Sequence, residues 1–352
     1  MREDRVAVLR GPGDVELDVL ADEAAAAARA AANAKRSRRR SIAITMSQER
    51  QPLSATEKEM LRLLRIHAGD PGHGPAAPRG TEGGFAAPEE EALLRHVRAA
   101  AKHPEHMEEC IRTLKASLGW RHRVDAAALP GKLRRGELPK AAAFARTFPW
   151  GLHGSDAMGH PCLWFRLGRV DVDAATTQFT AEEIRKHAGC VLECVCERMA
   201  ELSRTHGDGA TINKYYLIMD AAGISRRHVS RKFRDVVNEL YVFQDYYPSL
   251  LLHVFIINAP WYLKTAWRFT KGKLLPATRD KFSFLMRKKR RGKKGRKGGG
   301  GKQFQGATGD AGWREVLAEQ GIPPEAVPPE FGGPGGAPVI GMFNPLVVGT
   351  GE

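Results

Sequence analysis

Hydrophobic positions in the first third of the chain recur every three or four residues, which is typical of helices. From Ser54 onward, Leu61 and Leu64 lie about one turn apart on a single helical face. Ser54 and Glu57 have the spacing of a capping box, in which each side chain accepts the other residue's backbone N–H. We therefore predict a small helical unit over roughly 54–125, with helices from Ser54 and over 88–101 and 104–121.

From about residue 160 the pattern changes, and short apolar runs alternate with helical patterns. Four runs predict strands at 162–168, 215–220, 250–258 and 281–286, and the helical patterns lie at 180–205, 226–243 and 312–321. Such alternation predicts a mainly parallel sheet, and continuous apolar runs predict strands that helices cover on both faces. The expected fold class is α/β, with the helical unit preceding the sheet.

The segment that follows the third strand is apolar around most of its predicted helix. Asn258 is a plausible N-cap, Pro260 suits a first turn, and Lys264, Arg268 and Lys271 form only a narrow polar stripe. The other positions are Trp261, Tyr262, Leu263, Ala266, Trp267, Phe269 and Thr270. Such a helix suits a lid that covers an apolar cavity and opens at a membrane surface. The alternative is an ordinary helix packed between the sheet and the helical unit.

Several segments occur here in the order found in CRAL-TRIO domains: "GHPCLWFRLGRVD", "YYLIMDAAGIS", "FQDYYPSLLLHVFIINAPWYLKTAWRF", "LLPATRDKFSFL" and "VPPEFGG". The chain therefore resembles that family over about residues 90–333. The family includes phosphatidylinositol-transfer, retinaldehyde-binding and tocopherol-binding proteins. The resemblance implies a sheet that floors a lipid pocket and a mobile helix over it, here called the gate segment (residues 261–278).

The resemblance also implies roles for individual residues. Thr278 and Lys281 match the family's phosphate-contacting hydroxyl and lysine, and Ser249 stands where an acidic residue often follows "YYP". The expected pocket residues are Tyr215, Leu217, Phe255 and Ile257, with those of the gate segment named above. An expected arginine near Arg98 and Lys102 is alanine, which weakens the inositol assignment. The ligand is therefore left open among phosphatidylinositol, another phospholipid, and a single-chain or isoprenoid lipid.

Charge is concentrated in one segment of the chain. Residues 287–302 hold ten Lys or Arg and no acid, and without them the net charge of +15 falls to +5. Interleaved Gly predicts a flexible insert, here assigned to 287–311, that docks on an anionic membrane. The expected membrane contacts are Lys264, Arg268, Arg287, Lys288, Lys289, Arg290, Arg291, Lys293 and Lys294. The alternatives are nucleic-acid binding, nuclear import and a loop that is merely solvated. The insert lacks aromatic residues for base stacking, which argues against specific recognition of a single strand.

No sequence motif indicates catalysis, so we expect a lipid carrier and not an enzyme, without cofactor or metal. A lipid sensor or scaffold without net transfer is the alternative. Cys190, Cys194 and Cys196 fall on a helix whose spacing favours buried thiols over metal ligands. The start lacks a signal-peptide core, so a cytosolic, peripherally membrane-associated monomer is expected. The expected divisions are a disordered segment 1–53, the helical unit 54–125, the lipid domain 126–333 and a tail 334–352.

Overall fold

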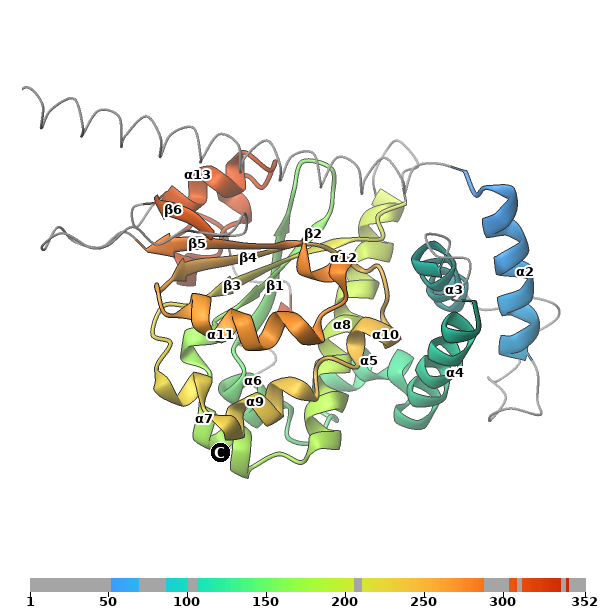
Figure 1. Cartoon of the computed structure of the whole chain (residues 1–352), viewed down its shortest axis with the longest axis horizontal. Coiled ribbons are helices and arrows are strands. Elements are labelled where there is room, and N and C mark those ends of the chain that lie inside the picture. The colour runs from blue at the N-terminus through green and yellow to red at the C-terminus, as the bar shows by residue number, and fades with distance from the viewer. Residues whose placement is uncertain are drawn as a thin grey trace, which may run out of the picture.

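A computed structural model of the chain describes residues 52–69, 87–100, 107–205, 211–287, 304–308, 312–336 and 340–341. The segment expected to be disordered (1–53) and the expected tail (334–352) lie almost entirely outside the described residues. Figure 1 shows two parts side by side, namely three helices at the right and a sheet with its covering helices at the left.

The helical unit consists of α2 (Ala55–Gly69), α3 (Ala87–Ala100) and α4 (Met107–Val124). The predicted capping box is confirmed: the Ser54 N–H donates to Glu57 Oε2 (2.8 Å), and the Glu57 N–H donates to Ser54 Oγ (3.2 Å). The predicted apolar stripe is buried with its neighbours in one cluster. That cluster consists of Met60, Leu61, Leu64, Leu93, Val97, Cys110 and Leu114.

The sheet has seven strands in the order β6-β5-β4-β3-β2-β1-β7. They are β1 (Trp150–Ser155), β2 (Pro161–Phe165), β3 (Tyr215–Asp220), β4 (Leu251–Ala259), β5 (Phe282–Arg287), β6 (Phe304–Thr308) and β7 (Ile340–Gly341). Strands β2 to β6 run parallel, whereas β1 pairs antiparallel with β2 and with β7. The predicted mainly parallel α/β fold is thus confirmed.

The remaining helices connect and cover these strands. They are α5 (Leu129–Arg134), α6 (Ala141–Thr147), α7 (Val172–Thr177), α8 (Ala181–Thr205), α9 (Arg231–Asn238), α10 (Phe243–Tyr246), α11 (Leu263–Thr270), α12 (Pro276–Arg279) and α13 (Gly312–Ala318). Helix α8 and helix α13 cover opposite faces of the sheet. Leu163 and Tyr215 pack in the cluster that contains α8, whereas Cys162, Trp164 and Tyr216 pack with α13. The alternation follows from the period of two in a strand.

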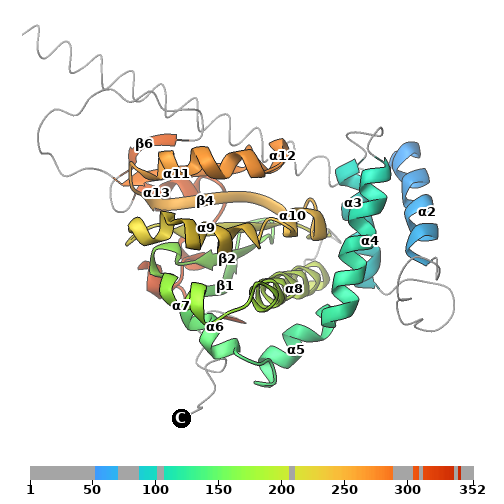
Figure 2. The same cartoon turned by 60° about the horizontal axis from the view of Figure 1, so that its bottom comes forward.

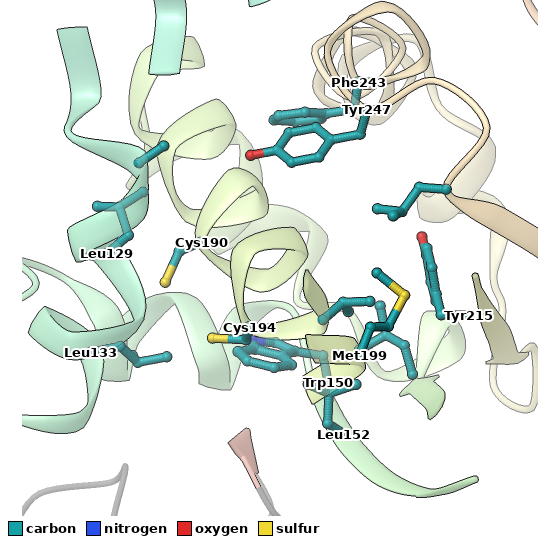
Figure 3. Close-up of a cluster of buried hydrophobic side chains, with 14 of the residues drawn as sticks. Leu129, Leu133, Trp150, Leu152, Cys190, Cys194, Met199, Tyr215, Phe243 and Tyr247 are labelled. Carbon is teal, nitrogen blue, oxygen red and sulfur yellow. The ribbon is translucent and has the colours of Figure 1, made fainter. Parts of the chain in front are cut away.

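The α8 cluster includes two of the five cysteines. Figure 3 shows Cys190 and Cys194 pointing from α8 toward Leu129 and Leu133 of α5, with Trp150 of β1 below. Both thiols are buried in this apolar cluster, and Cys196 is half-buried. Burial is what the helical spacing of these cysteines predicted.

Some predicted elements differ from the structure. The helix expected over 226–243 divides at Ser230, whose Oγ accepts the Phe233 N–H (3.3 Å) and so begins α9 afresh. The flexible insert expected over 287–311 is wrong at Phe304–Thr308, which pairs with β5 as β6. Strand β1 and helices α5 and α6 were not predicted, because they are short and carry no clear hydrophobic period.

Buried His187 of α8 gives the fold a pH-dependent stability. Its ring stacks on Phe144 (centroids 4.7 Å apart, planes 18°), and it is 5% exposed. Burial, aided by the charge of Lys186, lowers the pKa of His187 to about 4, although Glu183 acts in the opposite direction. Since the unfolded pKa is near 6.5, stability is complete above that pH and decreases as the pH falls toward 4.

We expect this titration to remove roughly 3 kcal/mol of the free energy of unfolding between those two pH values. His187→Gln should reduce the loss over that window, as measured by urea unfolding at closely spaced pH values. His122→Gln is the control, because His122 is exposed on α4. Equal pH profiles for wild type and His187→Gln would contradict the assignment.

Candidate functional site

A cavity of about 400 Å³ lies between the sheet and helices α9, α10 and α11. Alternate side chains of β3 form part of its floor: Tyr215, Leu217 and Met219. Figure 2 shows α11 and α12 above β4, with α9 and α10 beside it and α8 below. The size is typical of a pocket for an organic ligand, and the lining is mostly aliphatic and aromatic.

Helix α9 supplies one wall of the cavity. Its lining residues are Phe233, Val236, Val237 and the following Leu240. These positions are spaced i, i+3, i+4 and i+7, so they share one helical face. The sequence prediction missed them as pocket residues, and this spacing is the signal that could have found them.

Polar side chains gather where β4 and β5 begin. Ser249, Thr278 and Lys281 all line the cavity there, although 29 or more positions separate Ser249 from the other two. The Lys281 ammonium donates to the Leu251 carbonyl oxygen. Ser249 has a positive φ of 59°, which places it in a tight turn immediately before β4. The cavity therefore has one end with a hydroxyl pair and a cation and a larger apolar remainder.

The gate segment packs one face against the sheet. Leu263 and Trp267 of α11 are buried and line the cavity. The Trp267 ring lies 4.8 Å from the ring of Phe282 and 5.1 Å from that of Phe284, both on β5. Thr270 also lines the cavity. Helix α11 thus covers the cavity with aromatic contacts to the strand beneath it.

Four hydrogen bonds, here called the latch bonds, hold the gate segment to the opposite wall. The Tyr262 hydroxyl donates to the Ile224 carbonyl oxygen (2.6 Å). The Lys273 ammonium donates to Asn238 Oδ1 (2.5 Å). The Gln244 side chain donates to the Lys273 carbonyl oxygen (3.2 Å) and accepts the Leu275 N–H (3.0 Å). The structure therefore shows the gate segment closed at both ends.

The loop that carries Ile224 is fixed by a close backbone approach. A Cβ atom on Gly168 would lie 1.9 Å from the Ala222 carbonyl oxygen, so no side chain fits there. Gly223 in the same loop has a φ of 91°, a conformation that glycine adopts without strain. The acceptor of the Tyr262 latch bond is thus part of a tightly packed frame.

Two predicted pocket residues lie on the wrong face of the sheet. Phe255 and Ile257 are fully buried in the α13 cluster and do not line the cavity, whereas their neighbour Ile256 does. The apolar run of β4 is continuous, so its pattern does not reveal which residues face which side. Tyr215 and Leu217, predicted from the shorter strand β3, do line the cavity.

The start of the gate segment also differs from the prediction. Asn258 does not cap α11; it has a φ of 55° and donates its side-chain amide to Asp220 Oδ1 (2.8 Å). Helix α11 begins later, after Tyr262, which is not among the lining residues. The side chains of Ala266 and Phe269 lie outside what the structure describes.

The rim of the cavity is apolar and exposed. Trp261 is 68% exposed and Leu275 is 53% exposed, one near each end of the gate segment. Across the opening, Val229 and Leu240 line the cavity and are also partly exposed, at 37% and 36%. Trp261 is thus a rim residue and not a lining residue.

The predicted membrane cations are only partly described. Arg268 is exposed on α11, and Arg287 ends β5. The side chains of Lys264 and Arg287 are not described, and Lys288, Lys289, Arg290, Arg291, Lys293 and Lys294 lie outside the described residues. In the described part of the chain, no helix has the length and apolar character needed to cross a bilayer.

A buried ionic network contacts the cavity wall through Tyr247. The Tyr247 hydroxyl donates a hydrogen bond to the Glu193 carboxylate of α8. The same carboxylate accepts hydrogen bonds from both terminal nitrogens of Arg121 on α4. Side chains of Arg121 and Glu193 are 12% and 7% exposed. Burial, together with the Glu193 charge, raises the pKa of Tyr247. This network joins the helical unit, α8 and a lining residue of the cavity.

Residues 145–293 match the family model of the CRAL/TRIO domain. The chain contains a CRAL/TRIO domain. That match spans β1 to β5, the α9 wall and the gate segment, so the cavity lies within the domain.

Similar proteins include the phosphatidylinositol/phosphatidylcholine transfer protein SFH4 of Arabidopsis thaliana, 29% identical over 42% of this chain and 24% of that protein. The SEC14 cytosolic factor of Candida glabrata is 26% identical over 70% of each chain. The Sec14 cytosolic factor of Schizosaccharomyces pombe is 27% identical over 41% of this chain and 50% of its own length. The crystal structure of Sfh5 has a TM-score of 0.48 and 16% identity, covering 67% of this chain and 82% of that one. This chain therefore spans between about a quarter and 70% of the lengths of these curated relatives.

Proposed function

We propose that this protein binds one lipid in the cavity of its CRAL/TRIO domain and transfers it between membranes. The observation that carries the proposal is an apolar cavity of about 400 Å³ with its hydroxyls and a cation at one end, closed by a latched helix. Two similar proteins bear the names of a phosphatidylinositol/phosphatidylcholine transfer protein and a cytosolic factor, which supports it. The proposal includes no catalytic step.

The physical need for such a cavity comes from the acyl chains. A two-chain lipid has on the order of 30 methylenes, and each costs about 0.8 kcal/mol when exposed to water. A carrier must therefore offer an apolar interior and remain closed between membranes. The aliphatic lining and the closed gate segment correspond to these two requirements. A cavity of about 400 Å³ suits a small organic ligand, so a two-chain lipid would enter with the gate segment displaced and the cavity widened.

The polar end of the cavity suits a phosphate. We assign Lys281 as its charged donor, with the hydroxyls of Thr278 and Ser249 as directional partners. An ammonium and a hydroxyl together satisfy several oxygens of one phosphate. The acyl chains would then extend along β3 beneath the gate segment.

The exposed rim suits a membrane surface. Trp261 and Leu275 would enter the headgroup region, and exposed Arg268 and Lys271 would face anionic lipids. Each engaged cation contributes about 1 kcal/mol near an anionic leaflet. The basic segment 287–302 would add to this attraction. The protein is accordingly proposed to associate peripherally with membranes.

Lipid identification by native mass spectrometry and solvent extraction tests binding, and transfer between donor and acceptor vesicles tests transport. We expect one lipid per chain and net transfer. A bound lipid without net transfer would support the alternative, a lipid sensor or scaffold. A cavity still empty after incubation with mixed vesicles would contradict the carrier.

Lys281→Met tests the phosphate assignment. It should lower the occupancy of phosphatidylinositol by about 10-fold to 100-fold, because a charge-assisted hydrogen bond is worth about 1.5–3 kcal/mol. Lys58→Met is the control, since Lys58 is exposed on α2 and lies outside the cavity lining. Equal occupancy in the two variants would place the headgroup elsewhere.

A further inference from the structure

The outer side of the α9 wall is rich in cations. Five exposed cations, here called the α9 cations, fall between Ser225 and Asp235: Arg226, Arg227, Arg231, Lys232 and Arg234. Asp235 is the only acid in that stretch. The opposite, apolar side of the same helix lines the cavity. The α9 wall therefore presents a positively charged surface to solvent and an apolar surface to the proposed ligand.

The α9 cations do not help their own helix. The free N–H groups at the start of a helix carry partial positive charge, so acids in the first turn stabilise a helix and cations destabilise it. Helices α2, α4 and α8 follow this rule, with Glu57, Glu108 and Glu182 in their first turns. The first turn of α9 instead holds Arg231 and Lys232 and no acid. The stability of α9 therefore does not explain these cations, and a partner of opposite charge does.

The α9 cations lie beside the apolar rim of the cavity. Arg226 begins and Val229 ends one short 3-10 helix, and Val229 lines the cavity and is 37% exposed. The Tyr262 hydroxyl bonds to the Ile224 carbonyl oxygen, just before this 3-10 helix. The neighbouring Trp261, 68% exposed, therefore stands near the same loop. Figure 1 shows α9 alongside α11, and latch bonds join the two segments at both ends.

We propose that the α9 cations and the apolar rim beside them form the surface by which the protein docks on an anionic membrane. The inference deepens the proposed function and rests on it, because a carrier must meet the bilayer with the opening of its cavity. Acidic headgroups supply the negative charge, and the interfacial region accepts exposed Trp261 and Val229, for which a nucleic acid offers no apolar layer. Docking through α9 would hold this wall on the bilayer while the gate segment moves.

The test measures the partitioning of the full-length protein onto vesicles of phosphatidylserine and phosphatidylcholine by cosedimentation. Arg226→Gln/Arg231→Gln/Lys232→Gln should lower the partition coefficient by about a hundredfold, because each cation near an anionic leaflet contributes about fivefold, which is about 1 kcal/mol.

The matched control is Lys58→Gln/Arg123→Gln/Arg204→Gln. It removes the same charge from exposed positions on α2, α4 and α8 that lie outside this surface, and it should change the partition coefficient little. Equal partitioning of the two triple variants would overturn the docking surface. A loss in the α9 variant that is confined to the binding of duplex DNA would assign the surface to a nucleic acid and would also overturn it.

Two further measurements separate the hypotheses. Urea unfolding of the α9 triple variant should give a free energy of unfolding equal to or above that of wild type. A marked loss of stability would show that these cations serve the fold, and would overturn the inference. Lipid extracted from wild type tests the proposed function by itself. An empty cavity would overturn that function, whereas the vesicle measurement decides the docking surface.

Discussion

Glu193→Ala is expected to lower the free energy of unfolding by about 3–5 kcal/mol, because it leaves the buried Arg121 guanidinium without its carboxylate. The Arg121 side chain is only 12% exposed, so its charge has little access to water once the carboxylate is removed. Tyr247 would lose its acceptor as well. Urea unfolding followed by circular dichroism measures the loss.

The matched control lies one turn further along α8. Glu197 pairs with Arg134 at 2.7 Å, but these side chains are 42% and 48% exposed. Glu197→Ala should therefore cost less than about 1 kcal/mol. Similar losses in the two variants would show that burial does not decide the strength of these pairs.

The double variant Leu217→Trp/Met219→Trp should reduce lipid occupancy at least a hundredfold. Both side chains line the cavity from β3, so each indole would take space that acyl chains need. Excluding only five methylenes costs about 4 kcal/mol at about 0.8 kcal/mol each, which alone is nearly a thousandfold in affinity. Lipid extraction after incubation with vesicles gives the occupancy.

The folded state should tolerate these two substitutions, since the added rings enter an existing cavity and not the packed core. Lys58→Trp is the control, because it adds an indole on the exposed surface of α2, outside the lining. Normal occupancy in the double variant with unchanged thermal unfolding would show that the lipid lies elsewhere.

Local rules account for the parts of the fold that were predicted well. The capping residues Thr180 and Glu183 fix the start of α8: the Glu183 N–H donates to Thr180 Oγ1 (3.2 Å) and the Thr180 N–H to Glu183 Oε2 (2.9 Å). Such signals act within one turn of helix and survive in any tertiary context. The alternation of strands and helices likewise predicted the parallel sheet.

The predictions that were wrong concern residues whose contacts lie far away in the sequence. The side chains of Phe255 and Ile257 face α13, a helix that lies more than 50 positions later in the sequence. Asn258 does not cap α11, because its side-chain amide donates a hydrogen bond to Asp220 at the end of the neighbouring strand. Glu193 looks like an ordinary polar residue of α8 until Arg121 and Tyr247 are brought to it.

The candidate site was predicted through family resemblance more than through pattern. Thr278 and Lys281 line the cavity as the resemblance implied, although their contact with a headgroup remains a proposal.

The close packing around Ile224 bears on how the proposed opening would occur. Because the Gly168 backbone lies against the Ala222 carbonyl, the acceptor of the Tyr262 hydroxyl would stay in place when α11 moves away from it. The four latch bonds, at about 1 kcal/mol each, would contribute about 4 kcal/mol to the free energy of opening in water. On their contribution alone about one molecule in a thousand would be open at any instant, so a carrier of the proposed kind would rarely release its lipid until a bilayer competes for the same side chains.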